Sequence, residues 1–151
     1  MIAARQPVHA SVVAARTSQG WRGVLLQGPS GVGKSDLALR LMHDGWRLVG
    51  DDWVEVFACR GALYAAVPGA IAGRMEVRGV GVVTRPFRPS ARLALALRLT
   101  HEPVERLPQP TWRIMEGVPL PQLELDPRPA SAAAVAAAAL HAVSTMAPPA
   151  L

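Results

Sequence analysis

The stretch that decides the fold is Gly28-Pro29-Ser30-Gly31-Val32-Gly33-Lys34-Ser35, which reads G-x-x-x-x-G-K-S without a gap. This is the Walker A pattern of a loop that binds phosphate. The glycines of this pattern allow positive φ and leave no Cβ between the backbone amides and an anion. Lys34 is expected to reach the β- and γ-phosphates of a nucleotide, and the Ser35 hydroxyl is expected to ligate Mg²⁺.

The residues on either side of this loop supply the strand and the helix that it needs. Residues 23–27 form a short apolar run that predicts a buried strand, and residues 36–42 carry apolar side chains at helical spacing. Gly45 stands where a C-terminal glycine cap belongs. Lys34 is also the only lysine in a chain with 16 basic residues. A glycine-rich turn that matches by chance is the alternative, and the agreement of both flanks argues against it.

Composition limits the class of protein. With 151 residues, half of them hydrophobic and few aromatic, the chain is expected to form one α/β domain over residues 1–151. The net charge is +5, but the arginines are scattered singly, so we expect no nucleic-acid partner; an acidic nucleotide or a phosphoprotein explains the sign equally well. Cys59 is the only cysteine, which excludes a disulfide framework. Neither a signal peptide nor an apolar run of about 18 residues is recognisable, so we expect a cytoplasmic protein without a membrane segment.

A pair of carboxylates, Asp51 and Asp52, follows a second apolar strand at residues 47–50. A phosphate-transferring enzyme needs carboxylates opposite its phosphate loop. One of them can hold Mg²⁺, and the other can accept a proton from an incoming hydroxyl. Adjacent residues of a strand point to opposite sides, so we expect the two aspartates to have different roles. A solvated turn is the alternative.

The glycine-rich stretch at residues 73–83 contains Glu76, Arg74 and Arg78. Glu76 could be a second metal ligand, and Arg78 could hold the oxygens of a transferring phosphoryl group. A glycine-rich connector with a surface ion pair explains the same residues equally well, so both interpretations stay open.

The remaining elements follow from local patterns. Residues 8–15 predict a strand that forms a hairpin with the strand before the loop, and residues 54–67 predict a second hairpin. Alternating leucines at residues 93–99 predict a strand, and residues 120–125 predict an edge strand among prolines. Residues 130–146 predict an alanine-rich helix, capped by its second residue, a serine. By itself, the histidine of the first strand is more often a packed residue than a catalytic one.

Taken in order, four stretches resemble the catalytic domain of HPr kinase/phosphorylase, the bacterial enzyme that acts on a serine of the phosphocarrier protein HPr. They are residues 8–11 (VHAS), 28–42 (GPSGVGKSDLALRLM), 45–52 (GWRLVGDD) and 75–81 (MEVRGVG). The last one is similar to the family's E-[IV]-R-G-[LV]-G signature. Many families share the Walker motif alone, whereas this ordered set is far more specific and spans most of the first half of the chain.

The resemblance implies a fold and an activity. The family's fold is an α/β P-loop domain that looks related to phosphoenolpyruvate carboxykinase, with a mostly β core, the Walker A helix and a C-terminal helix. Its members use ATP and Mg²⁺ and are typically homohexamers. The expected function is therefore an ATP-dependent serine kinase that phosphorylates HPr or an HPr-like protein, with reverse phosphorolysis as a second activity.

The resemblance also implies roles for individual residues. Asp51 would be the base that deprotonates the target serine, and the acid in the reverse direction, assisted by His9. Ser35 and Glu76 would serve the Mg²⁺, and we predict Asp52 as a further metal ligand. The predicted catalytic residues are Asp51, Lys34, His9 and Arg78.

Two features of the chain leave other functions open. The resemblance covers only the catalytic part, so the N-terminal domain of longer members is expected to be absent. The family's late arginine, expected just before the last helix, has no clear counterpart, and the nearest residue is Arg128. A nucleotide-binding sensor without turnover is therefore one alternative, and a small-molecule P-loop kinase with another hydroxyl acceptor is a second.

Overall fold

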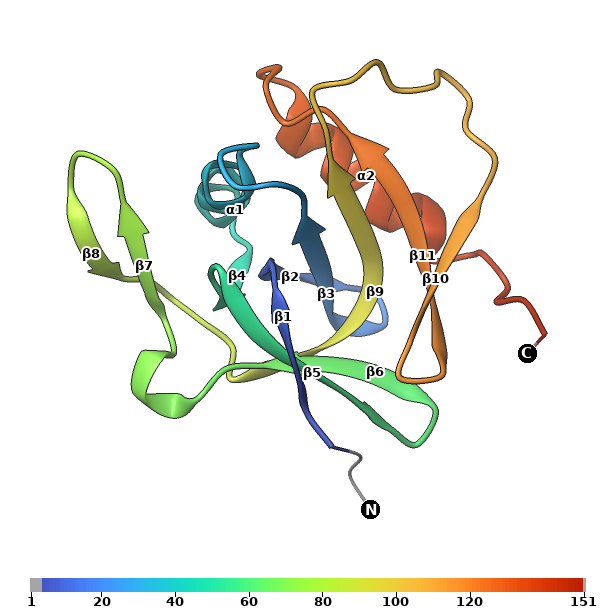
Figure 1. Cartoon of the computed structure of the whole chain (residues 1–151), viewed down its shortest axis with the longest axis horizontal. Coiled ribbons are helices and arrows are strands. Elements are labelled where there is room, and N and C mark those ends of the chain that lie inside the picture. The colour runs from blue at the N-terminus through green and yellow to red at the C-terminus, as the bar shows by residue number, and fades with distance from the viewer. Residues whose placement is uncertain (1–3, 151) are drawn as a thin grey trace.

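The strand before the glycine-rich loop lies in the middle of a large mixed sheet (Figure 1). The computed structural model describes residues 4–150. The central strand, β3 (Gly20–Gln27), pairs antiparallel with β2 (Ser11–Thr17) on one side and parallel with β9 (Ser90–Leu99) on the other. The glycine-rich loop and α1 (Lys34–His43) follow this strand directly.

The sheet extends on both sides of this centre. The order along its main path is β1-β5-β6-β9-β3-β2-β4. The C-terminal half of β9 also pairs with β11, in parallel, and β11 pairs antiparallel with β10. The remaining elements of this layer and the second helix are β1 (Gln6–His9), β4 (Arg47–Gly50), β5 (Trp53–Cys59), β6 (Ala62–Ala66), β10 (Thr111–Met115), β11 (Val118–Leu125) and α2 (Ala132–Val143).

Side chains alternate between the two faces of the central strand, and each face has its own core. Leu26 is buried in a cluster with Leu37 of α1 and Leu140 of α2, so both helices cover the same face. Leu25 is buried in a second cluster with Val56 of β5, so the outer strands curl over the opposite face. The loop that joins β3 to α1 is thereby held between two packed layers.

A separate two-stranded hairpin, β7 (Arg74–Val77) and β8 (Gly81–Thr84), projects from the body on the side of α1 (Figure 1). A short 3-10 turn (Gly69–Ile71) leads into it. Met75 is 2% exposed and belongs to the core cluster that contains α1. The next residue, Glu76, is exposed on the other side of the strand.

The end of α1 confirms the glycine cap predicted from the sequence. Gly45 has a φ of 97°. Its amide donates to the carbonyl of Met42 at 3.1 Å, and the amide of Trp46 donates to the carbonyl of Leu41 at 3.1 Å. This pair of bonds is a Schellman motif, in which a residue with positive φ lets the chain leave the helix while the last carbonyls are satisfied.

The predicted fold class is confirmed: an α/β domain with a mostly β core, one helix after the loop and one helix near the C-terminus. The hairpin predicted at residues 54–67 is confirmed as β5 and β6, with positive φ at both Arg60 and Gly61 in its turn. Neither of the helices in residues 4–150 has the length and apolar character that crossing a membrane requires.

Two details of the sequence prediction are wrong, at Ala10 and at Ser131. The single strand predicted at residues 8–15 is broken at Ala10, because its first half pairs with β5 and its second half with β3 and β4. The predicted edge strand, β11, agrees with the structure: it pairs with β10 up to Gln122 and with β9 from Gln122 onward, so only Gln122 has strand partners on both sides. Its two prolines precede this point, on the part that pairs only with β10. Ser131 precedes α2 but makes no capping hydrogen bond through its side chain.

Candidate active site

The glycine-rich loop has the backbone conformation that the Walker pattern predicts. Its glycines have φ values of 152°, 82° and 121° at Gly28, Gly31 and Gly33. At Gly28 space as well as conformation requires glycine, because an added Cβ would lie 2.8 Å from the carbonyl oxygen of Leu99 and 2.9 Å from Cγ1 of Val32. The loop therefore closes tightly over the end of β9.

Lys34 is the first residue of α1, and its side chain folds back over the loop. Its Nζ donates to the carbonyl of Gly28 at 2.7 Å and to the carbonyl of Pro29 at 3.1 Å. The residue is only 7% exposed. The loop's own carbonyls thus hold the ammonium group at the loop.

Ser35 and Asp51 meet at the start of α1. The Ser35 hydroxyl donates to Oδ1 of Asp51 at 2.8 Å. The same carboxylate oxygen accepts a second hydrogen bond, at 2.7 Å, from the hydroxyl of Ser11 at the start of β2. Asp51 follows β4 directly, so the neighbouring strands β2 and β4 together present this carboxylate to the loop serine.

Asp52 faces a different group. Its Oδ1 lies 2.8 Å from Nε2 of His9, the last residue of β1. Trp53, the residue directly opposite His9 across the β1–β5 pair, packs against the imidazole with a distance of 5.0 Å between the ring centroids. The resemblance implied that His9 assists Asp51, whereas the structure places His9 against Asp52. The prediction that the two aspartates face different partners is consistent with this geometry.

A tight turn separates the two carboxylates. The amide of Trp53 donates to the carbonyl of Asp51 at 2.8 Å, and the residue between them, Asp52, has a φ of 70°. This is a three-residue γ-turn with a positive central φ, which is rare and strained. A further bond from the amide of Ala10 to the carbonyl of Asp52, at 2.9 Å, ties the turn to the end of β1.

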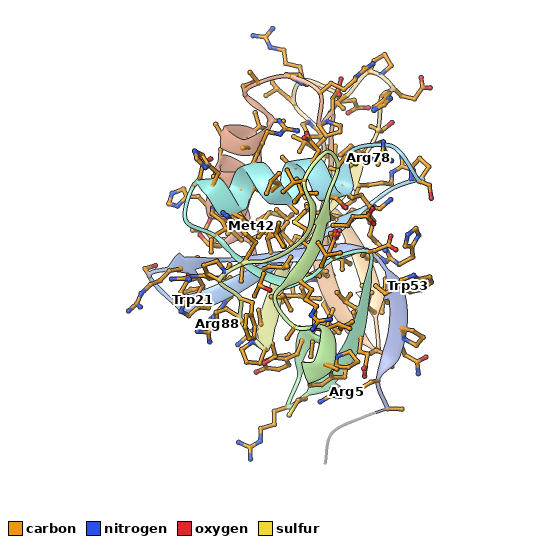
Figure 2. The ribbon with its side chains drawn as sticks, turned by 90° about the vertical axis from the view of Figure 1, so that its left-hand side faces the viewer. Arg5, Trp21, Met42, Trp53, Arg78 and Arg88 are labelled. Carbon is orange, nitrogen blue, oxygen red and sulfur yellow. The ribbon has the colours of Figure 1, made fainter. Side chains whose placement is uncertain are left out.

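Glu76 and Arg78 lie on the projecting hairpin. Arg78 is at its tip, as Figure 2 shows, and Trp53 lies on a different element, beside β1. Within residues 4–150, no hydrogen bond or ion pair joins either Glu76 or Arg78 to the loop or to the aspartates. Their roles as metal ligand and phosphate clamp stay predictions.

Oxygen donors around Ser35 are of the kind that Mg²⁺ prefers. The hydroxyl of Ser35 and the carboxylate of Asp51 are adjacent, and Mg²⁺ in phosphate-transferring sites takes one or two carboxylates plus phosphate oxygens and waters. A dedicated cage of three or more acidic, histidine or cysteine side chains is not found in the described part of the chain. The residues present therefore fit a Mg²⁺ that arrives with a phosphate ligand.

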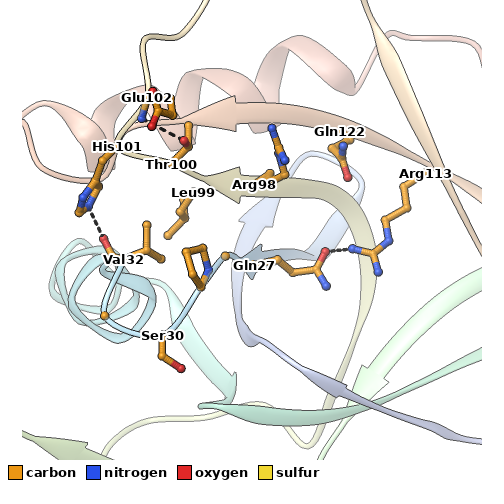
Figure 3. A pocket seen from close by; sticks show the side chains of 13 residues that line it. Gln27, Ser30, Val32, Arg98, Leu99, Thr100, His101, Glu102, Arg113 and Gln122 are labelled. Carbon is orange, nitrogen blue, oxygen red and sulfur yellow. Dashed lines mark hydrogen bonds between the residues drawn. The ribbon is translucent and has the colours of Figure 1, made fainter.

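On the other side of the loop lies a cavity of about 650 Å³ (Figure 3). The residues that line it come from the loop, from the strands β3, β9, β10 and β11, and from the segment after β9: Gln27, Gly28, Pro29, Ser30, Gly31, Val32, Arg98, Leu99, Thr100, His101, Glu102, Arg113 and Gln122. Arg113 donates a hydrogen bond to the side-chain oxygen of Gln27, and Arg98 forms an ion pair with Glu124 at 2.6 Å. The cavity is thus continuous with the loop and carries polar side chains.

The loop after β9 closes one side of this cavity. Nε2 of His101 lies 3.0 Å from the carbonyl oxygen of Val32, so His101 contacts the glycine-rich loop directly. Arg128, just before α2, donates to the carbonyl of His101 at 3.0 Å and forms an ion pair with Asp126 at 2.9 Å. The hydrogen bonds from Arg128 lower the pKa of Asp126 from its ordinary 3.8 to about 2.

Sequence patterns did not identify several of these residues. Ser11 is fully buried, and its position in an apolar strand gives no signal beyond a hydroxyl among hydrophobic neighbours. His101 and Arg113 are separated from the loop by about 70 and 80 positions in the chain, so only the tertiary fold brings them to it. Pairing of β3 with β9, which a sequence pattern cannot specify, creates the cavity.

A strand, a glycine-rich loop with three positive φ values and a helix that starts with lysine and serine are the arrangement of a P-loop domain. The carboxylates opposite the loop add the acidic groups that such domains use. The chain belongs to the HPr Serine kinase C-terminal domain family, whose sequence model matches residues 1–138.

Two curated relatives match parts of the chain. HPr kinase/phosphorylase from Streptococcus thermophilus is 35% identical over 116 residues, which cover 68% of this chain and 38% of the relative. HPr kinase/phosphorylase from Clostridium tetani is 44% identical over 64 residues, which cover 42% of this chain and 21% of the relative. The match thus spans about two fifths of the Streptococcus protein and a smaller part of the other.

The fold is also that of a solved structure. The HPr(Ser) kinase/phosphatase from Coxiella burnetii superimposes with a TM-score of 0.77, over 91% of this chain and 95% of the other. At 21% sequence identity this likeness shows the common fold.

Proposed function

We propose that the chain is the catalytic domain of an ATP-dependent protein serine kinase, with HPr or an HPr-like phosphocarrier protein as its acceptor. The observation that carries this proposal is the division of the two aspartates. Asp51 faces the loop serine, and Asp52 faces His9. A phosphate-transfer site needs one carboxylate for the metal and another for the acceptor hydroxyl.

The donor would lie along the glycine-rich loop. Backbone amides of the loop and the N-terminus of α1 attract its phosphates. Lys34, held at the loop's carbonyls, needs only a small rotation of its side chain to exchange these partners for β- and γ-phosphate oxygens. The adjoining cavity, about 650 Å³ in volume, is of the size that holds a nucleoside. This supports ATP rather than a bare pyrophosphate as the donor.

Ser35 and Asp51 would hold the Mg²⁺. The metal would neutralise charge that develops on the transferring phosphoryl group. Asp51 accepts hydrogen bonds from two hydroxyls through one oxygen, so its orientation is fixed from both sides. Glu76 remains a candidate for a further ligand, because its side chain is exposed on the hairpin that projects on the side of α1.

Asp52 would be the base. Its side chain is 63% exposed, so a hydroxyl on the surface of another protein can reach it, whereas Asp51 is already engaged at the loop. The serine proton passes to the carboxylate of Asp52, the serine oxygen bonds to the γ-phosphorus, and the bond to the β–γ bridging oxygen breaks to release ADP. His9, hydrogen-bonded to Asp52, orients this carboxylate. In phosphorolysis, inorganic phosphate would attack the phosphoserine phosphorus, the bond from phosphorus to the serine oxygen would break to give pyrophosphate, and Asp52 would return a proton to the serine oxygen.

The larger context of this activity rests on the family. We propose that residues 1–151 form one catalytic domain. Copies of the chain would assemble into a homo-oligomer, a hexamer as is typical of the family. The protein would act in the cytoplasm, where ATP is available. Light scattering on the purified chain measures the assembly. We propose no nucleic-acid or membrane partner.

One alternative has an observation in its favour. Arg128, the residue nearest to the expected late arginine, is engaged by Asp126 and by the carbonyl of His101. If no arginine serves the transferred phosphate, the chain would bind a nucleotide and act as a sensor without turnover. A small-molecule kinase is a second alternative, because no contact in the described residues defines the acceptor.

Transfer of label from γ-labelled ATP with Mg²⁺ to purified HPr-type proteins tests the proposal. We expect label on a serine of the acceptor. Asp52→Asn keeps the shape of the side chain but removes the base, so it should lower the rate by about 10²- to 10⁴-fold with an unchanged Mg²⁺ requirement. Asp51→Asn should instead raise the Mg²⁺ concentration that gives the half-maximal rate.

The outcomes separate the candidates. ATP binding without transfer to any acceptor supports the sensor. Transfer to small alcohols but not to HPr-type proteins supports the small-molecule kinase. If Asp52→Asn transfers phosphate at the normal rate while Asp51→Asn does not, the base is Asp51, as the sequence resemblance implied.

A further inference from the structure

The side chain of Ser11 forms hydrogen bonds with both members of the aspartate pair. Its hydroxyl donates to Oδ1 of Asp51 at 2.7 Å and accepts from the backbone amide of Asp52 at 3.3 Å. The residue is 0% exposed. In the described part of the chain, the only other buried polar residue is Lys34, which is 7% exposed. A buried hydroxyl with both a donor and an acceptor role is fully satisfied and therefore has a defined orientation.

The backbone at Asp52 needs such a partner. A residue other than glycine at a φ of 70° is strained, and it persists only where the surroundings enforce it. Two adjacent residues, Ala10 and Ser11, each supply one group that enforces it here. The amide of Ala10 donates to the carbonyl of Asp52, and the hydroxyl of Ser11 accepts from the amide of Asp52. The start of β2 thus holds the peptide units on both sides of the strained residue.

The same hydroxyl also orients the carboxylate that would bind the metal. Ser11 and Ser35 donate to the same oxygen of Asp51, from opposite elements. Without Ser11 the carboxylate keeps only the bond from Ser35, the group beside which it would bind a metal. Partners that orient a metal-binding carboxylate typically contribute 10- to 100-fold to metal affinity or activity.

We propose that Ser11 is a positioning residue that holds the turn so that Asp51 faces the loop serine while Asp52 faces His9. It touches neither donor nor acceptor, and it acts through the two aspartates. This role rests on the proposed function for its effect on catalysis, but its effect on the turn and on Mg²⁺ binding is measurable without any phosphate transfer.

The test compares Ser11→Ala, which removes the hydroxyl, with Ser11→Thr, which retains it. We expect Ser11→Ala to lower kcat and to raise the half-maximal Mg²⁺ concentration, each by about 10- to 100-fold, with an unchanged KM for the acceptor. Ser11→Thr should restore both parameters to within a few-fold of the wild-type values. If Ser11→Ala does not fold, Ser11→Cys, which is close to serine in volume and only a weak donor, carries the same comparison.

Thr17 provides a matched control on the same strand. Its hydroxyl also donates to a carbonyl, that of Gly20 at 2.7 Å, and also accepts from an amide, that of Gln19 at 3.1 Å. Thr17→Ala therefore removes the same kind of hydrogen bonds at the opposite end of β2. It should leave kcat and the Mg²⁺ requirement unchanged.

Two readouts do not depend on turnover. Calorimetric titration of MgATP should show weaker binding to Ser11→Ala but unchanged binding to Thr17→Ala. Hydrogen exchange at the amide of Asp52, observed by NMR, should accelerate in Ser11→Ala because the amide loses its acceptor. If Ser11→Ala exchanges faster but binds MgATP and turns over like the wild type, Ser11 is only structural and the inference is overturned. If the wild type transfers no phosphate but the binding and exchange differences remain, the proposed kinase activity fails while the positioning role stands.

Discussion

At Asp52 the requirements of the backbone and of the side chain conflict. The turn at a φ of 70° suits glycine, whereas the hydrogen bond to His9 requires a carboxylate. Strained conformations of this kind are kept where a side chain must point in a direction that a relaxed strand does not offer. Without the turn, β5 would begin directly after β4, and Asp52 would not reach the end of β1.

Substitutions at Asp52 should separate the two requirements. Asp52→Ala and Asp52→Gly both remove the carboxylate, but only glycine adopts the turn without strain. We expect Asp52→Gly to be more stable than Asp52→Ala by about 1–2 kcal/mol in the free energy of unfolding, although neither transfers phosphate. Urea unfolding followed by circular dichroism measures the difference. Equal stabilities would show that the turn relaxes when the carboxylate is lost.

The sequence predicts that the two aspartates differ, but not which of them faces the loop. Period-2 alternation of a strand was the reason for this prediction, but both aspartates lie in the turn between β4 and β5, and the turn directs them to different partners. Which one meets Ser35 depends on the γ-turn, and the turn depends on Ser11 and Ala10 of a strand about 40 positions earlier in the chain. A residue pattern in one short stretch contains no information about such a distant hydrogen bond.

Among the elements, the segment between β11 and α2 packs on the glycine-rich loop and leads into the second helix. Arg40 of α1 donates to the carbonyls of Pro127 and Pro129, at 2.5 Å and 3.2 Å. A Cβ on Gly33 would lie 3.2 Å from Cγ of Pro127, so this segment packs directly on the glycine-rich loop. The ion pair of Asp126 with Arg128 shapes the same segment.

The lowered pKa of Asp126 predicts how this segment responds to acid. Its pKa in the folded state is about 2, below the ordinary 3.8, because Arg128 donates hydrogen bonds to its carboxylate. Such a group contributes stability that is complete above about pH 4 and is lost as the pH falls toward about 2. Asp126→Asn should therefore be less stable than the wild type at pH 6, and the difference should shrink between about pH 4 and pH 2.

Unfolding in urea at pH 6, 4 and 3 measures this convergence, with Arg128→Gln as the control that removes the partner instead. Both variants should lose the same pH-dependent contribution, since the pKa shift needs both groups. A difference from the wild type that stays constant down to pH 3 would mean that the ion pair does not form in solution.

Elements with local signals were predictable, and elements defined by distant pairing were not. The strand, loop and helix around Lys34 and the hairpin of β5 and β6 follow from spacing, turn residues and caps within a few positions. The break at Ala10 arises because two different strands compete for one continuous β segment. The position of β11 beside β9 depends on a connection of 18 residues between β9 and the start of β11, which the sequence does not orient.

At the scale of the whole molecule, the site has two sides that belong to different parts of the sheet. The side proposed to bind the metal is formed by β2, β4 and the start of α1, and the cavity side is formed by residues of β3, β9, β10 and β11. The glycine-rich loop lies between them. Ligands of parallel strands bind outside their carboxyl ends, and β3, β9 and β11 are the parallel strands of this sheet. A nucleotide on the loop would therefore extend from Ser35 toward the cavity.

Filling the cavity should weaken binding of the nucleoside without weakening binding of the phosphates. Gln122→Trp places a large ring on β11 at the cavity wall, away from the loop amides. We expect at least a tenfold increase in Kd for ATP, which corresponds to about 1.4 kcal/mol, and an unchanged Kd for tripolyphosphate. Gln19→Trp, in the exposed turn between β2 and β3, adds the same ring at a site without a cavity and should change neither value. Calorimetric titration with both ligands distinguishes the outcomes. An unchanged Kd for ATP would place the nucleoside elsewhere, and equal weakening for both ligands would mean that the substitution distorts the loop itself.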